Sequence, residues 1–259
     1  MKGNRFFKKK SNKGCLLIHG LSSSTQEIEE LAHYLYSKGY TVLATLLKGH
    51  NTSIKDLYKT TWKDWYSSIE KDFNFLSKYC NKIYVIGLSI GATLSMHLIV
   101  NKKASKIKGL ILLAPAIFYT SPLVKLTPIL KYIKKYSVKD YSKYYPERKE
   151  AFFDIVDEKA LKDRIAYKKI PLSSIESALN LIKTVKKEIK YIKVPTLIIH
   201  SKKDHTIKPE SSKYIYDNLN IDKEEKKIIY TENSGHVIIT DLDKKEVFKE
   251  ILDFIKKRK

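Results

Sequence analysis

Short apolar segments alternate with longer segments of helical periodicity along most of the chain. The apolar segments are nearly continuous, which is typical of strands buried on both faces of a parallel sheet. Because helical segments separate them, we expect an α/β protein with a mostly parallel central sheet and helices on both of its faces. The pattern predicts six strands, at 15–19, 41–46, 82–87, 107–114, 195–201 and 226–231.

Helices are predicted where apolar side chains recur every three or four residues. The clearest of them begins at Trp62 and places Trp65, Ile69, Phe73 and Leu76 on one face, so we interpret its aromatic residues as core. Further helices are expected at 26–38, 91–101, 209–219 and 244–257.

Residues 115–193 interrupt this alternation. They contain no convincing strand, only helical stretches and many tyrosines, and the insertion is too long for an ordinary connection between a strand and a helix. We therefore expect a core formed by 1–114 and 194–259, with 115–193 inserted as a helical cap over the carboxyl edge of the sheet.

The chain of 259 residues carries 50 basic and 28 acidic residues, a formal net charge of +22. Such an excess raises the question of a nucleic-acid or anionic-lipid partner. Nearly all the basic residues are lysines, however, and they are spread over every polar segment. No aromatic–basic motif of the known nucleic-acid modules is present. We expect no specific nucleic-acid partner, and only a weak attraction to anionic surfaces.

The cellular compartment is indicated by the apolar segments and the cysteines. The longest apolar run, at 109–118, has about ten residues, whereas a membrane span needs about twenty. The basic N-terminus lacks the apolar region of a signal peptide. Cys15 and Cys80 have no Cys or His neighbour at metal-ligand spacing. These features predict a cytoplasmic protein with reduced thiols and no bound metal, either a monomer or a homodimer.

The segment from Gly87 to Gly91, Gly-Leu-Ser-Ile-Gly, fits the pattern G-x-S-x-G around Ser89. It follows a predicted strand and leads directly into a predicted helix, the context in which such a serine lies on a tight, strained turn. The two glycines leave room for neighbouring elements, and the helix N-terminus favours a developing negative charge. The alternative is an ordinary helix N-cap with incidental glycines.

A serine hydroxyl is a poor nucleophile until a base takes its proton. His236 lies in the loop between the last predicted strand and the last helix, where its ring can reach the edge of the sheet near Ser89. His33 and His97 fall within predicted helices and His200 within a buried strand, so packing or exposure explains them better. His236 is therefore the predicted base.

The imidazole needs a carboxylate that fixes its tautomer. Asp204 follows the strand at 195–201 and so lies at the carboxyl edge of the sheet, whereas Asp241 and Asp243 follow His236 too closely and begin the last helix. Asp204 is the better candidate. The order Ser89, Asp204, His236 is the order found in α/β-hydrolases.

An oxyanion formed at Ser89 would need two backbone donors. The N–H of Ile90 follows the nucleophile, and the N–H of Leu21 lies in the loop after the first central strand. Gly20 allows the backbone to approach closely, and His19 is expected to orient this loop by hydrogen bonding.

These motifs resemble the small bacterial carboxylesterases and monoacylglycerol lipases of the α/β-hydrolase fold. The resemblance covers nearly the whole chain outside the cap. It implies Ser89 as nucleophile, Asp204 and His236 as its partners, and Leu21 and Ile90 as oxyanion donors. It also implies a cytoplasmic, cofactor-free enzyme acting on esters of short- to medium-chain acyl groups. The segments that carry it are "HGLSSSTQEIEELAHYL", "LKGHN", "WKDW", "IYVIGLSIGA", "PTLIIHSKKDHTIKPESSKYIYDNL" and "SGHVIITDLDKKEVFKEILDFI".

The sequence departs from the family pattern at three places. Asn51 replaces the second glycine of G-H-G, Ala92 replaces a glycine often found after the turn, and Leu21 replaces an aromatic residue. Apart from glycine, asparagine is the residue that best tolerates a positive φ. The departures leave the chemistry intact and leave the substrate preference open.

Three functions are compatible with this sequence. The leading one is a serine hydrolase that cleaves carboxylic esters, as a carboxylesterase or monoacylglycerol lipase. An acyl thioesterase would use the same triad on acyl-CoA or an acyl-carrier protein. A hydrolase-fold protein that only binds a ligand or partner is the third, although such proteins normally lack a triad member.

Overall fold

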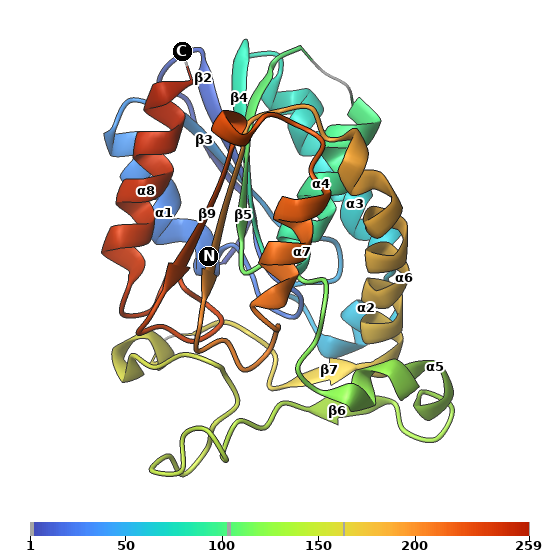
Figure 1. The fold of residues 1–259 in the computed structure, drawn as a ribbon. Helices are drawn as coiled ribbons and strands as arrows, with labels where there is room; N and C mark the ends of the chain where they lie inside the picture. The colour runs from blue at the N-terminus through green and yellow to red at the C-terminus, as the bar shows by residue number, and fades with distance from the viewer. Residues whose placement is uncertain (1–2, 103–104, 163, 259) are drawn as a thin grey trace.

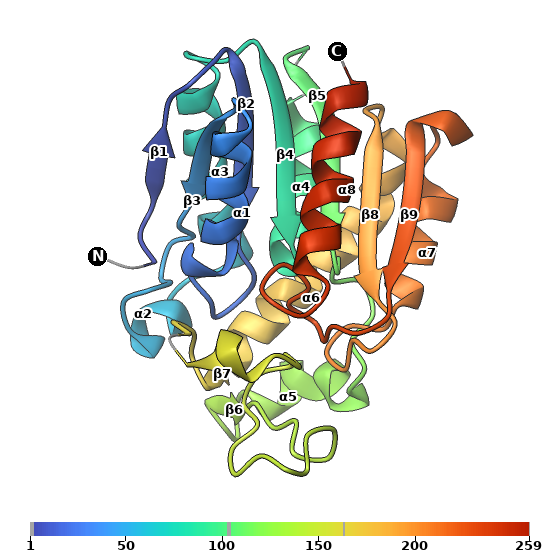
Figure 2. The same cartoon turned by 90° about the vertical axis from the view of Figure 1, so that its left-hand side faces the viewer.

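The computed structural model describes residues 3–102, 105–162 and 164–258. Within them, a seven-stranded sheet of order β1-β3-β2-β4-β5-β8-β9 forms the centre of the molecule (Figures 1 and 2). β1 pairs antiparallel with β3, and every other neighbouring pair is parallel. The strands are β1 (Phe6–Lys8), β2 (Lys13–Ile18), β3 (Thr41–Thr45), β4 (Lys82–Leu88), β5 (Ile107–Leu113), β8 (Thr196–Ser201) and β9 (Lys226–Thr231).

All six strands predicted from the sequence are present, and their ends differ from the prediction by at most two residues. The prediction missed β1, because three residues are too few to show a hydrophobic alternation. This strand forms the edge of the sheet and is followed by Lys9 and Lys10, which is typical of an edge that must not pair with another chain.

Helices cover both faces of the sheet, as expected (Figures 1 and 2). Successive strand residues point to opposite faces. Thus Leu16 and Ile18 of β2 belong to one buried cluster, and Cys15 and Leu17 belong to the other. The first cluster includes side chains of α3 (Trp62–Leu76), α4 (Ile90–Lys102) and α7 (Glu210–Asn218), and the second those of α1 (Gln26–Ser37) and α8 (Lys244–Lys257).

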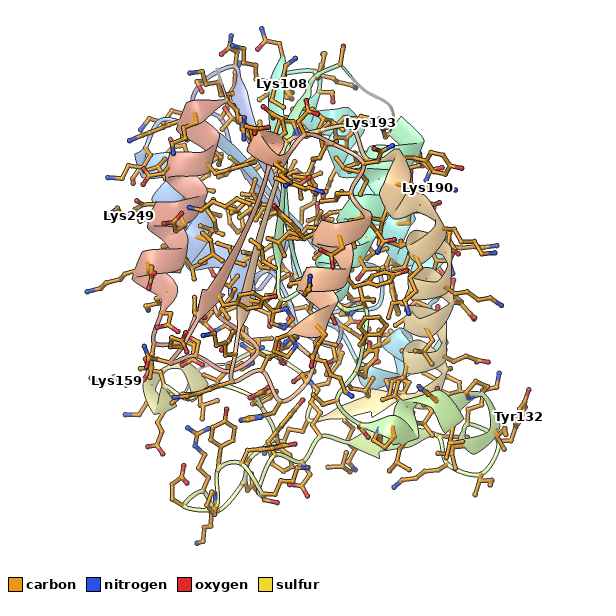
Figure 3. All side chains as sticks on the ribbon, in the orientation of Figure 1. Lys108, Tyr132, Lys159, Lys190, Lys193 and Lys249 are labelled. Atoms are coloured by element: carbon orange, nitrogen blue, oxygen red, sulfur yellow. The ribbon has the colours of Figure 1, made fainter. Side chains whose placement is uncertain are left out.

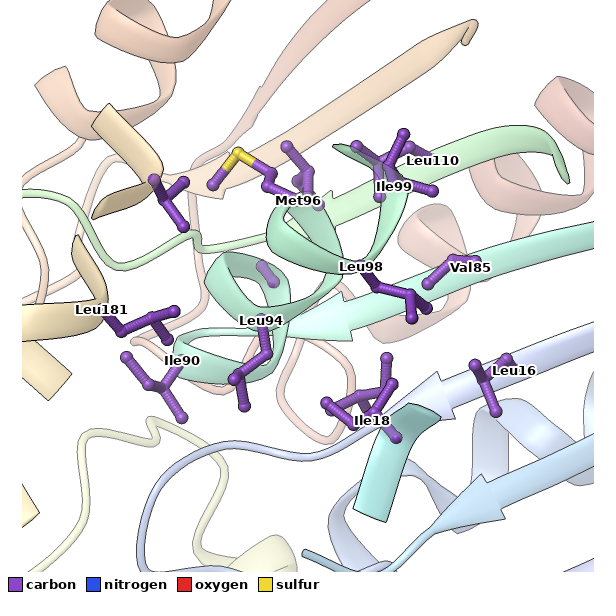
Figure 4. Close-up of a cluster of buried hydrophobic side chains, with 14 of the residues drawn as sticks. Leu16, Ile18, Val85, Ile90, Leu94, Met96, Leu98, Ile99, Leu110 and Leu181 are labelled. Atoms are coloured by element: carbon purple, nitrogen blue, oxygen red, sulfur yellow. The ribbon is translucent and has the colours of Figure 1, made fainter. Parts of the chain in front are cut away.

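The helix α4, which begins directly after Ser89, is buried from Ile90 to Ile99. Figure 4 shows its apolar side chains projecting in different directions, with Leu98 towards Val85 of β4 and Ile90 beside Leu181 of another helix. A helix that is apolar on all sides is held in a packed interior. Its first turn therefore has a fixed position relative to the ends of β2 and β4.

The expectation of a purely helical cap is corrected by the structure. The described residues of the segment 115–171 form only short helical turns and two short strands, of which β6 (Tyr136–Val138) pairs antiparallel with β7 (Lys169–Pro171). The sequence gave no sign of these strands because each has three residues and its partner lies more than thirty residues away. The helical turns are η1 (Pro122–Leu126), α5 (Thr127–Leu130) and η2 (Glu158–Leu161).

The long helix expected inside the cap is α6 (Leu172–Glu188), followed by η3 (Ile189–Tyr191). It packs against α3 and α4, and its buried residues Ala178, Leu181 and Val185 share their hydrophobic cluster. By packing, α6 therefore belongs to the helical layer that covers this face of the sheet. The domain boundary at 193 stays a prediction. Two short helices complete the described elements, α2 (Ile54–Tyr58) and η4 (Lys223–Glu225).

In the part of the chain that the structure describes, no helix is both long enough and apolar enough to cross a bilayer. Figure 3 shows five labelled lysines on different sides of the molecule in this view. The lysines labelled there are Lys108, Lys159, Lys190, Lys193 and Lys249.

Candidate active site

Ser89 lies on the sharp turn between β4 and α4. Its φ is +56°, in the left-handed region that non-glycine residues rarely adopt. The Ser89 N–H donates to the carbonyl of Leu113 at 2.8 Å, and its carbonyl accepts the N–H of Ala92 at 3.1 Å. An N-cap residue typically has an extended backbone. The strained conformation therefore favours a functional turn over an ordinary cap.

Gly87 and Gly91 are the sites of closest backbone approach at this turn. A Cβ on Gly91 would lie 2.5 Å from the carbonyl oxygen of His19 and 2.6 Å from that of Ile18. A Cβ on Gly87 would lie 2.4 Å from the carbonyl oxygen of Gly91. Gly91 thus lets the end of β2 and the loop after it pass directly beside the turn, and Gly87 lets the first turns of α4 pack against β4.

The substitution Gly91→Ala is expected to destabilise the fold by about 3 kcal/mol, because the new methyl group meets rigid backbone on β2. Urea denaturation would measure the loss. Gly39→Ala is the matched control: it has a positive φ of +99° but open space around the Cβ, so about 1 kcal/mol is expected. Equal losses for the two variants would show that close approach at Gly91 is not what requires glycine.

His236 and Asp204 come from loops after neighbouring strands, β9 and β8, and they meet at the carboxyl edge of the sheet. The Nδ1–H of His236 donates to Asp204 Oδ2 at 2.6 Å. The other oxygen of Asp204, Oδ1, accepts the backbone N–H groups of Thr206 at 2.8 Å and Ile207 at 2.7 Å. Both side chains are buried, so the carboxylate and the imidazole are held in one orientation.

His236 and Asp204 shift each other's pKa. Burial alone lowers the pKa of His236, but the charge of Asp204 and its hydrogen bond outweigh this effect, so the pKa is raised. Burial acts to raise the pKa of Asp204, but the His236 ring and the hydrogen bonds from His200 and His236 hold it well below its usual range. Asp204 therefore stays ionised beside an imidazole that is stabilised once it gains a proton.

His200 is a second imidazole on the same carboxylate. Its Nε2–H donates to Asp204 Oδ2 at 2.9 Å, and its Nδ1 lies 2.7 Å from the hydroxyl of Ser212. The ring is completely buried, which agrees with its interpretation as a satisfied core residue. The sequence did not show that His200 binds Asp204. The two residues are only four positions apart, however, and this spacing allows the contact.

Ser89 and His236 border one cavity of about 80 Å³ at the carboxyl edge of the sheet, together with Gly20 and Leu21. Asp204 lies behind His236, on the side away from this cavity. The structure thus brings all three predicted residues to one place. In the described residues no hydrogen bond joins the Ser89 hydroxyl to His236, and such contacts are often long before a substrate is bound.

The two predicted oxyanion donors come from different segments: Ile90 follows Ser89 in the chain, and Leu21 borders the same cavity as Ser89. In the part of the chain that the structure covers, the N–H groups of Leu21 and Ile90 donate to no protein acceptor. The neighbouring N–H, that of Gly20, is used differently and donates to Glu27 Oε2 at 2.9 Å. This hydrogen bond fixes the loop and leaves the next N–H, that of Leu21, free for a ligand.

His19 orients this loop by hydrogen bonding, as the sequence predicted. Its Nε2 accepts the N–H of Leu47 at 3.2 Å, so its Nδ1 carries the proton and donates to the carbonyl of Gly20 at 2.8 Å. Burial lowers the pKa of His19, which keeps the ring neutral. Asn51, which replaces the second glycine of G-H-G, has a positive φ of +56°, a conformation that asparagine tolerates.

The carboxylates at the end of the His236 loop have a role that the sequence did not reveal. Asp241 was expected only to begin the last helix, but it accepts the N–H of Gly235 at 2.7 Å and those of Val156 and Asp157, both at 2.8 Å. It therefore ties the loop of His236 to the cap. Asp243 likewise accepts backbone N–H groups of the loop that precedes His236.

Asp154 is a buried cap residue that sequence reasoning missed. Its backbone carbonyl accepts the N–H of His236 at 2.9 Å, and its carboxylate accepts the Tyr145 hydroxyl at 2.8 Å and the His205 N–H at 2.7 Å. Burial and the nearby charge of Asp204 raise its pKa. The only signal in the sequence was an acidic residue between apolar ones in "AFFDIV".

No group of three or more His, Cys, Asp or Glu side chains in the described ranges is arranged to hold a metal ion. Cys15 and Cys80 are both buried free thiols. The cavity is bordered by Ser89, by Leu21 and by His236, whose imidazole is oriented by Asp204.

The chain is similar to known proteins over almost its whole length. The chain is 28% identical over 250 residues to a carboxylesterase of Bacillus subtilis (strain 168), covering 96% of this chain and 94% of that protein. It is 29% identical over 255 residues to a thermostable monoacylglycerol lipase of Bacillus sp. (strain H-257), with 97% and 94% covered. A structure described under LipS and LipT, two metagenome-derived lipolytic enzymes, matches with a TM-score of 0.88 at 25% identity and covers 98% of each chain.

The predicted fold class is confirmed, since these structural neighbours have the α/β-hydrolase fold. Residues 9–243 match the family described as "Serine aminopeptidase, S33", which is most of the chain and includes Ser89, Asp204 and His236. The protein therefore belongs to this family of α/β-hydrolases.

Proposed function

We propose that the protein is a serine hydrolase that cleaves carboxylic esters, with Ser89 as nucleophile, His236 as base and Asp204 as the acid that orients it. The observation that carries this proposal is the short His236–Asp204 hydrogen bond at the wall of the cavity that also holds Ser89 on its strained turn. The relatives named carboxylesterase and monoacylglycerol lipase support it further.

The proposed reaction proceeds through an acyl-enzyme. The Ser89 oxygen attacks the ester carbonyl while His236 Nε2 takes the hydroxyl proton, and the N–H groups of Leu21 and Ile90 stabilise the oxyanion. His236 then gives the proton to the leaving alcohol, and water hydrolyses the acyl-enzyme by the same route. Asp204 stays ionised throughout and stabilises the imidazolium. No cofactor is required, because these residues supply the nucleophile, the base and the oxyanion donors.

We infer that the acyl chain binds in a second, larger cavity of about 670 Å³ beneath the cap. It adjoins the cavity at Ser89, since Leu21, Tyr119 and Tyr141 border both. Apolar cap side chains such as Leu130 and Ile133 line much of it, which suits an acyl group of short to medium length. We also propose a cytoplasmic location, supported by the two free thiols.

Specificity constants for a panel of substrates would test the proposed function. The panel contains p-nitrophenyl butyrate, 1-butyrylglycerol, butyryl-CoA and an aminoacyl p-nitroanilide. The proposal expects the two oxygen esters to be the best substrates. A higher kcat/KM for butyryl-CoA would support the thioesterase instead, and turnover of the anilide alone would indicate a peptidase. No turnover of any compound would favour a protein that only binds.

The pH dependence of ester hydrolysis should report the titration of His236. Its pKa is raised above the usual value of about 6.5, and only the neutral ring can accept the Ser89 proton. As the pH falls through this raised pKa, the ring becomes protonated and kcat/KM is lost. We expect an acid limb with an apparent pKa above 6.5. An apparent pKa below 6 for this acid limb would contradict the raised pKa of His236.

A further inference from the structure

Two cationic side chains from the cap border the Ser89 cavity, and both lie close to one aromatic ring. The Nζ of Lys139 and the guanidinium of Arg164 each lie 5.1 Å from the ring centre of Phe153, which also borders the cavity. Arg164 is paired with Glu27, whose side chain is buried. The Arg164 side chain is only 7% exposed, and its Nε is buried without a hydrogen-bond partner in the described residues.

The charges of Lys139, Arg164 and Glu27 at the cavity do not cancel. Glu27 neutralises Arg164, whereas no acidic side chain among the described residues forms an ion pair with Lys139. Burial and the charge of Arg164 lower the pKa of Lys139 to about 7. The pKa falls because a half-buried ammonium group without a counter-ion is less stable in its charged form than it is in water. The other carboxylate at the cavity, Asp154, is already held by Tyr145 and by loop donors.

The position of these cations relative to the two cavities indicates which part of a substrate they face. Arg164 and Glu27 border only the smaller cavity, with Ser89 and His236, and Lys139 lies where the two cavities meet. The larger cavity provides the space for the acyl chain. The alcohol part of the ester is therefore left on the smaller side, next to the uncompensated positive charge.

We propose that the enzyme prefers esters whose alcohol part carries an anionic group, a carboxylate or a phosphate, which Lys139 binds beside the Arg164 guanidinium. This inference rests on the proposed function and names a substrate class for it. A bound anion supplies the counter-charge that Lys139 lacks among the described residues. Charge-assisted hydrogen bonds of this kind change affinity by about tenfold to a hundredfold.

The test compares two esters of the same shape. Butyryloxyacetate carries a carboxylate on the alcohol part, and butyryloxyacetamide is its neutral isostere. The ratio of their kcat/KM values, measured in one enzyme preparation, does not depend on how much of the protein is active. A second pair, 1-butyrylglycerol 3-phosphate and 1-butyrylglycerol, asks whether phosphate is the anion instead.

Lys139→Met should lower the anionic-to-neutral ratio at least tenfold relative to the wild type for one of the two pairs. Lys139→Arg should retain the ratio, because the charge is kept. Lys135→Met is the matched control: it removes an exposed lysine four residues away that borders neither cavity. Its ratio should equal that of the wild type.

The pH dependence of the ratio gives a second readout. Titration of His236 affects both esters equally and cancels in the ratio. Loss of the Lys139 proton affects only the anionic ester, so the wild-type ratio should fall as the pH rises through about 7, and the ratio of Lys139→Arg should stay constant. The charged or titratable groups around Lys139 are Arg164, Glu27, His50, Asp140 and Lys168.

Equal ratios in the wild type and Lys139→Met, for both pairs, would overturn the inference while leaving ester hydrolysis in place. An equal fall in Lys135→Met would assign the preference to the general field of the basic surface and would also overturn it. If no ester is cleaved and Ser89 does not react with a fluorophosphonate, the proposed function itself fails, and the inference fails with it.

Discussion

Replacing Ser89 with alanine is expected to lower kcat for ester hydrolysis by about a millionfold. The loss is large because the triad acts as a unit: without the hydroxyl, the base and the oxyanion donors have no nucleophile to activate. The measurement is hydrolysis of p-nitrophenyl butyrate by purified wild type and variant. The backbone at position 89 should be retained, because its φ of +56° is supported by hydrogen bonds of the main chain.

Ser23→Ala is the matched control for this substitution. Ser23 lies in the loop after β2 and is buried, and its hydroxyl has no hydrogen-bond partner among the described residues. Its removal should change kcat by no more than a few-fold. If Ser89→Ala retained more than about a hundredth of the wild-type kcat, Ser89 would not be the nucleophile.

The substitution Asp204→Asn is expected to lower kcat by about ten thousandfold. Oδ1 of Asp204 accepts the backbone N–H groups of Thr206 and Ile207, so the amide of asparagine must place its carbonyl oxygen there. Its NH₂ group then takes the place of Oδ2, faces His236 Nδ1 and donates to it. His200, whose Nε2 lies on the same atom, must move its proton to Nδ1, where the Ser212 hydroxyl can accept it. The imidazole of His236 is forced into the tautomer with its proton on Nε2, where it has no lone pair for the Ser89 proton.

This prediction is distinguished from simple unfolding by two measurements on the same variant. Circular dichroism should show a folded protein, since every donor to Oδ1 keeps its acceptor and the volume of the side chain is unchanged. The rate of ester hydrolysis should fall while KM changes little. A fall of less than tenfold in kcat would show that Asp204 does not fix the tautomer of His236.

The fold was predictable because its elements leave strong local patterns. Six buried strands show as continuous apolar runs, and helices such as α3 show as periodic apolar faces. The position of Ser89 was also local, since the strand, the two glycines and the helix are adjacent in the sequence. Asp204 and His236 were found because each follows a strand whose carboxyl end has to reach the same edge.

The cap and its contacts with the site were not predictable in the same way. β6 and β7 are too short to carry a pattern, and they are defined by their pairing with each other. The pair of Arg164 and Glu27 joins residues 137 positions apart, and the low pKa of Lys139 arises from burial that only the folded chain creates. Such features depend on tertiary structure and leave no spacing to recognise.

The central claim is that Ser89 is activated by His236 at the edge of the sheet. It is tested most directly by reacting the native protein with a fluorophosphonate and locating the adduct by mass spectrometry. We predict one adduct per chain, on the peptide that contains Ser89, and a labelling rate at least a hundredfold lower in His236→Ala. The absence of an adduct, an adduct on a different residue, or an equal rate in His236→Ala would contradict the account.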